Sequence, residues 1–108
     1  MATHFGKIDN YYTNMLAPKG FAGKRLMNFT GSFGKAIVWF IPNGSPLPDN
    51  KKHPEENVFD VYYQIDDWAA IIDILRNEKP VYFNFNDASN TAQMYTGNEP
   101  VGEEEHAP

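Results

Sequence analysis

Alternation of apolar and polar side chains is the clearest pattern in the chain. It covers residues 58–65, where the apolar positions are Phe59, Val61, Tyr63 and Ile65. Successive side chains of a strand point to opposite faces, so this alternation predicts a strand with one buried side. We expect the apolar set to face the core and the intervening Asp60, Tyr62 and Gln64 to face outward.

Four further segments have strand character. Residues 35–41 are β-branched and aromatic, lie between Gly34 and Pro42, and are apolar on both faces. This composition predicts a central strand. The other predicted strands cover residues 24–30, 81–86 and 91–96. Residues 1–20 fit either a short strand or a single helical turn.

One helix is predicted over residues 66–78. Its apolar side chains follow the i, i+3, i+4, i+7 spacing of a single helical stripe, at Trp68, Ile71, Ile72 and Leu75. Asp66 is a favourable N-cap, and Pro80 ends the helix because proline cannot continue it.

These segments together predict an α+β fold that is mostly β. From residue 24 the order is strand, strand, long loop, strand, helix, strand, strand, which is the order of a five-stranded oligonucleotide-binding (OB) barrel. We therefore expect a five- or six-stranded antiparallel sheet curled into a small OB-like, partly open barrel, with the helix between the third and fourth main strands. A half-open antiparallel sheet with the helix across one face fits the same order.

The length of 108 residues corresponds to one domain, which we expect to span residues 1–97, with residues 98–108 as an acidic, disordered C-terminal tail. The stretch 42–57 contains four prolines and predicts a long polar loop. The chain has no cysteine, which excludes disulfides and thiolate chemistry. With no run of about 18 apolar residues and no signal-peptide pattern, we expect a cytoplasmic protein that does not enter a membrane.

Charge is distributed unevenly between the two halves of the chain. Residues 1–52 contain seven basic and two acidic side chains, whereas residues 53–108 contain two basic and twelve acidic ones. The basic half also contains eight aromatic residues. Cations beside exposed aromatic rings are the features that bind single-stranded nucleic acid, because the cations neutralise phosphates and the rings stack on bases.

A small binding module for single-stranded nucleic acid is therefore the first functional hypothesis. The cations expected to contact phosphates are Lys24, Arg25, Lys35, Lys51 and Lys52. The rings expected to stack on bases are Phe29, Phe33 and Trp39, with Phe40 as the alternative to Trp39 because the two lie on opposite faces of one strand. The repeated Gly-x-x-Gly-Lys pieces at residues 20–24 and 31–35 fit either a phosphate-binding loop or, more simply, two β-turns.

Two other hypotheses remain open. The whole chain is acidic, with a pI near 5.0, which counts against a polyanion binder. The second hypothesis, of equal rank with the first, is a protein–protein module, such as an inhibitor, an immunity-type protein or an assembly subunit. Its acidic face would consist of Asp60, Asp66, Asp67, Asp73 and Glu78. The third hypothesis is a barrel that holds a small ligand or performs catalysis. We identify no catalytic set, predict no cofactor, and find no metal-ligand spacing among the three histidines.

Overall fold

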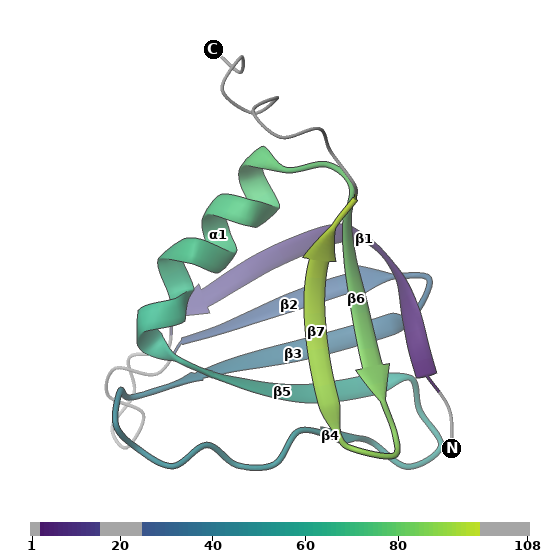
Figure 1. The fold of residues 1–108 in the computed structure, drawn as a ribbon, viewed down its shortest axis with the longest axis horizontal. Coiled ribbons are helices and arrows are strands. Elements are labelled where there is room, and N and C mark those ends of the chain that lie inside the picture. Colours follow the sequence, from purple (N-terminus) through teal and green to yellow (C-terminus); the bar gives the residue numbers. More distant parts are fainter. Residues whose placement is uncertain (1–2, 16–24, 98–108) are drawn as a thin grey trace.

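The computed structural model describes residues 3–15 and 25–97, which form a mostly β, partly open barrel with one α-helix (Figure 1). The elements in chain order are β1 (Thr3–Met15), β2 (Arg25–Gly31), β3 (Gly34–Ile41), β4 (Lys51–Lys52), β5 (Val58–Gln64), the short 3-10 helix η1 (Ile65–Asp67), α1 (Trp68–Asn77), β6 (Val81–Asn86) and β7 (Thr91–Thr96). The predicted strands from residue 24 onward and the predicted helix are thus present, with the helix in its expected place between β5 and β6. The predicted tail, residues 98–108, lies outside the described residues.

The sheet corrects two parts of the fold prediction. It has seven strands in the order β4-β5-β3-β2-β1-β6-β7, and it is mixed, because β3 and β5 run parallel. A parallel pair needs a crossover of about a dozen residues or more. Residues 42–57 provide that crossover, so the long loop that the prolines indicated is long enough to let β5 run parallel to β3.

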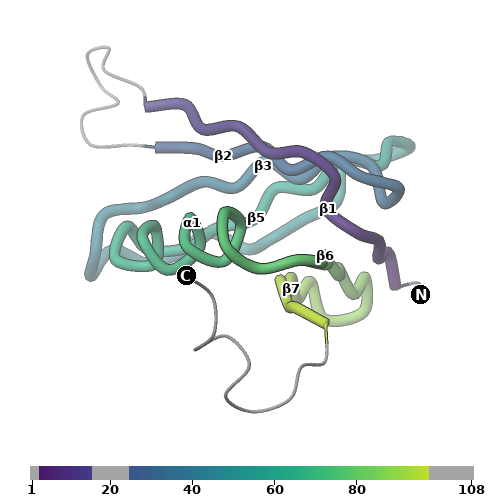
Figure 2. Tube along the Cα trace, turned by 90° about the horizontal axis from the view of Figure 1, so that it is seen from above, coloured from purple at the N-terminus to yellow at the C-terminus, as the bar shows by residue number. Residues whose placement is uncertain are grey.

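Strand β1 curls the sheet into a half-barrel. Its first part, from Thr3 to Lys7, pairs with β6, and its second part, from Ile8 to Met15, pairs with β2. The register with β2 shifts between Ile8 and Asn10, and an irregularity of this kind bends a strand. The bend carries β6 and β7 across the concave side of the other strands (Figures 1 and 2).

Phenylalanine rings fill the space enclosed by this bend. Phe59 of β5 lies 5.6 Å from Phe83 and 5.0 Å from Phe85, both of β6, measured between ring centroids. All three rings are at most 1% exposed. The residues predicted to face inward from β5 therefore do so, and the two layers of strands share one aromatic core.

Helix α1 closes one side of the half-barrel. Ile71 is buried, and the other members of the predicted stripe, Trp68, Ile72 and Leu75, pack against the core. The predicted cap is wrong, because residues 65–67 form a 3-10 turn and Asp67, which precedes α1, makes no capping hydrogen bond with its side chain. Instead, the backbone N–H of Asp66 donates to Oδ1 of Asn43 at 3.0 Å. The cap thus comes from a residue distant in sequence.

The proline-rich crossover covers the outer edge of β5. The side-chain amide of Asn50 accepts a hydrogen bond from the backbone N–H of Tyr62 at 2.9 Å, and Gln64 donates to the carbonyl of Ser45 at 3.3 Å. Strand β4 continues this cover by pairing with Phe59 and Asp60. Covering the edge satisfies backbone groups that would otherwise be free to pair with another chain.

Candidate binding surfaces

Two of the rings predicted to stack on nucleic acid lie in the core. Phe29 is 1% exposed and Phe33 is 5% exposed. Phe29 occupies the inner face of β2, a central strand, and Phe33 folds back from the β2–β3 turn so that its ring lies 4.8 Å from that of Phe83. Neither ring offers a free face to a base, because other strands enclose it. The sequence pattern does not reveal this enclosure, since it depends on pairing between distant segments.

Three of the remaining predicted residues lie on one surface. The outer side of the sheet presents Lys35, Trp39 and Lys51. Residues paired across neighbouring strands share a face, and these three are paired with Val58, Tyr62 and Asp60 of β5, respectively. We call this the outer face and define it by Tyr12, Asn28, Lys35, Ile37, Trp39, Lys51, Val58, Asp60 and Tyr62. Figure 2 shows that α1 lies on the other side of β2, β3 and β5, away from this outer face.

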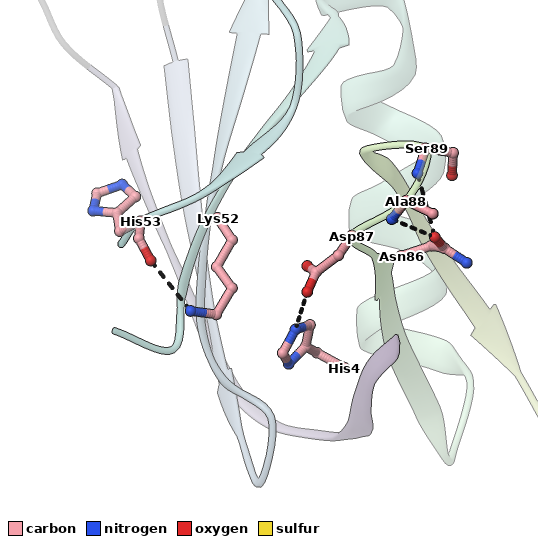
Figure 3. Close-up of polar contacts among 7 residues, drawn as sticks. All are labelled: His4, Lys52, His53, Asn86, Asp87, Ala88 and Ser89. Carbon is pink, nitrogen blue, oxygen red and sulfur yellow. Dashed lines mark hydrogen bonds and ion pairs between the residues drawn. The ribbon is translucent and has the colours of Figure 1, made fainter. Parts of the chain in front are cut away.

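The other predicted cations are elsewhere. Arg25 is on the inner side at the start of β2, where its Cζ lies 5.3 Å from the ring centroid of Trp68. Lys52 pairs with Phe59, so it has the opposite orientation to Lys51, and its Nζ donates to the carbonyl of His53 at 3.2 Å (Figure 3). Lys24 lies outside the described residues. The residues predicted to bind nucleic acid, as far as the structure describes them, are therefore divided between different surfaces and the core.

A polar cluster supports Trp39 on the outer face. Asp60 is only 9% exposed; its Oδ1 accepts a hydrogen bond from Trp39 Nε1 at 3.4 Å, and its Oδ2 lies 2.9 Å from His53 Nε2. Burial, followed by the negative charge of Asp60, raises the pKa of the neighbouring Tyr62 above its ordinary value. The carboxylate of Asp60 thus contacts both His53 and the indole of Trp39.

A groove forms where the end of α1 meets the bend of β1. We call it the α1–β1 groove. It has a volume of about 670 Å³ and is lined by residues 7–11 of β1 and residues 75–81, which end the helix and begin β6. Its charged residues are Lys7, Asp9, Arg76, Glu78 and Lys79. Among the described residues, none of the three cations takes part in a salt bridge.

Polar contacts at the opposite end of β6 serve the fold. His4 Nε2 lies 3.1 Å from Asp87 Oδ2, which ties the start of β1 to the β6–β7 turn (Figure 3). In the same turn, Oδ1 of Asn86 accepts hydrogen bonds from the backbone N–H groups of Ala88 and Ser89. Within the described parts of the chain, no three His, Cys, Asp or Glu side chains gather as a metal site. The helices of these parts are also too short or too polar to cross a membrane.

Sequence reasoning missed both the cluster around Asp60 and the α1–β1 groove. The alternation in β5 placed Asp60 and Tyr62 outward, but only the parallel pairing brings them beside Ile37 and Trp39. In the sequence, Arg76 and Lys79 are simply the cations that the carbonyl end of a helix favours. No local signal places Lys7 with them, because that proximity depends on the bend of β1.

Comparison with known proteins adds no assignment. Protein-family models give no match to the chain, and no match is found among curated proteins or solved structures.

Proposed function

We propose that this protein is a small binding module and that its outer face binds another protein. The observation that supports the proposal is the half-exposed apolar group formed by Ile37, Trp39 and Tyr62, at the centre of a sheet surface that no described helix covers. Tyr12, which is 56% exposed, extends this group to β1. Aromatic residues of this kind provide most of the binding energy at protein interfaces.

The geometry of Trp39 suits this role. Its indole is held by Asp60, which is itself held by His53, so the side chain loses little freedom when a partner covers it. A pre-ordered anchor lowers the entropy cost of association. Lys35 and Lys51 lie at the margin of the group, where they would favour a partner with acidic side chains around its apolar centre.

Single-stranded nucleic acid is the second candidate ligand of the same face. It is favoured by the placement of Lys35, Trp39 and Lys51 on one side of the sheet. The burial of Phe29 and Phe33 removes two of the proposed stacking rings, and the buried carboxylate of Asp60 lies among the remaining residues. We therefore rank a protein partner first.

Site-specific photocrosslinking tests the first candidate. A benzophenone amino acid replaces Tyr12 on the outer face or, as a matched control, the exposed Gln93 on β7. In an extract of the source cells we expect a defined protein to crosslink at position 12 and not at position 93, and Trp39→Ala to reduce that product. Equal products at both positions, or none at position 12, would contradict a protein partner at this face.

Fluorescence tests the second candidate. The variant Trp68→Phe leaves Trp39 as the single tryptophan, so its emission reports only on the outer face. Quenching by oligo-dT that weakens steeply as salt is added would favour nucleic acid, because phosphate contacts release counterions. Unchanged emission at low salt would exclude stacking on Trp39.

A further inference from the structure

We propose that the acidic segment of residues 98–108 binds in the α1–β1 groove of its own chain. This inference concerns a different surface from the proposed function and does not depend on it. The segment contains four glutamates, Glu99, Glu103, Glu104 and Glu105. The groove is lined by Lys7, Arg76 and Lys79.

Charge complementarity supports this occupant. The described part of the chain contains seven lysines and arginines, and three of them line this one groove. They form no salt bridge with any described carboxylate. Asp9 and Glu78 also line the groove, so its formal charge is +1, in a protein whose net charge is −5. The groove is thus a locally positive site on an acidic molecule.

The carbonyl end of α1 does not account for all of these cations. Arg76 and Lys79 are at or just beyond the end of the helix, where the dipole favours positive charge. Lys7, however, belongs to β1 and reaches the groove only because β1 bends there. Three cations from two separate elements therefore converge on one cavity, which the helix dipole alone would not require.

The path of the chain brings the acidic segment to this place. Thr96, the last residue of β7, is paired with Val81, and the backbone N–H of Gly97 donates to the carbonyl of Pro80 at 3.3 Å. Pro80 and Val81 both line the groove. Residue 98 consequently follows a residue in contact with the groove wall, and eleven residues can extend over roughly 35 Å.

Tethering makes even a weak attraction effective. A segment attached beside its site has an effective concentration on the order of millimolar, far above that of an external ligand in dilute solution. Individual exposed ion pairs are weak, but four glutamates facing three cations act together.

Paramagnetic relaxation enhancement tests the proposal in the full chain. Because the sequence has no cysteine, Ala107→Cys accepts a single nitroxide label. We expect the amide signals of residues 7–11 and 75–81 to broaden more than those of the outer face. High salt, or replacement of the four glutamates by glutamine, should abolish this broadening while leaving the dispersed spectrum of the folded body unchanged.

Two triple variants provide the matched comparison. Lys7→Gln, Arg76→Gln and Lys79→Gln together should abolish the broadening, whereas Lys35→Gln, Lys51→Gln and Lys52→Gln together remove the same charge elsewhere and should preserve it. Broadening that survives in the groove variant would overturn the proposal, as would broadening centred on another surface. Mixing labelled, isotope-free chains with unlabelled ¹⁵N chains identifies binding between copies, and broadening of comparable size in that mixture would also overturn it.

Discussion

The inner and outer faces of the same strands differ in how their apolar residues are used. Phe40 and Trp39 are adjacent in β3, yet Phe40 is fully buried and Trp39 is half-exposed beside Asp60. Their neighbours on the parallel strand β5 repeat the contrast, because Phe40 is paired with Tyr63 and Trp39 with Tyr62. The inner row packs against α1, whereas no described helix covers the outer row. Large apolar side chains of the outer row thus remain outside the core, on the face where we propose that a partner binds.

The largest effect should come from the inner row. Phe40→Ala removes a ring that lies 4.8 Å from Trp68 and 6.2 Å from Tyr63, and it leaves a cavity between the sheet and α1. We expect the free energy of unfolding to fall by about 3–5 kcal/mol. Chemical denaturation measures this change. A loss under about 1 kcal/mol would contradict the assignment of Phe40 to the core.

A smaller loss should follow from the adjacent residue. Trp39→Ala removes a half-exposed indole and one hydrogen bond to Asp60, while His53 still contacts that carboxylate. We expect about 1–2 kcal/mol, below the value for a fully buried ring. The same denaturation experiment, run beside Phe40→Ala, gives the ratio of the two losses in unfolding free energy directly. If both variants lost equal stability, Trp39 would belong to the core and the proposed binding face would lose its anchor.

Alkaline pH should separate the two tyrosines. Burial, then the charge of Asp67, raises the pKa of Tyr63, and burial, then the charge of Asp60, raises that of Tyr62. The unfolded chain therefore loses these protons first, so their contribution to stability is complete below pH 10 and decreases as the pH rises from there through the folded-state pKa. Tyr63→Phe should remove more of this pH dependence than Tyr62→Phe, because Tyr63 packs against the core. Denaturation midpoints measured at pH 8 and pH 11 decide the order.

The smallest effect on stability should come from the outer lysines. Neither Lys35 nor Lys51 forms a salt bridge with a described residue, so changing both to glutamine should leave the denaturation midpoint nearly unchanged. Binding of a partner at the outer face should nonetheless weaken, through a slower association rate. A clear loss of stability would show that these lysines support the fold, which would contradict their assignment to a binding margin.

Local patterns in the sequence were sufficient to locate most elements. Alternation along residues 58–65 identified both faces of β5, and the stripe of Trp68, Ile71, Ile72 and Leu75 identified the buried side of α1. These features are local because the period of a strand or helix is set by neighbouring residues. The same reasoning could not decide whether Trp39 or Phe40 faces inward, since residues 35–41 are apolar on both sides.

Pairing between distant segments decided everything else. The parallel alignment of β3 with β5, the bend of β1 and the packing of Phe33 on Phe83 each join residues far apart in sequence, and no local period records such contacts. For that reason the sequence alone determined where the helix and the strands β2, β3, β5, β6 and β7 lie, but it did not locate β1 or β4. Only the tertiary structure decided that Trp39 stands beside Asp60 on an open face, and that Lys7 meets Arg76 and Lys79 at one groove.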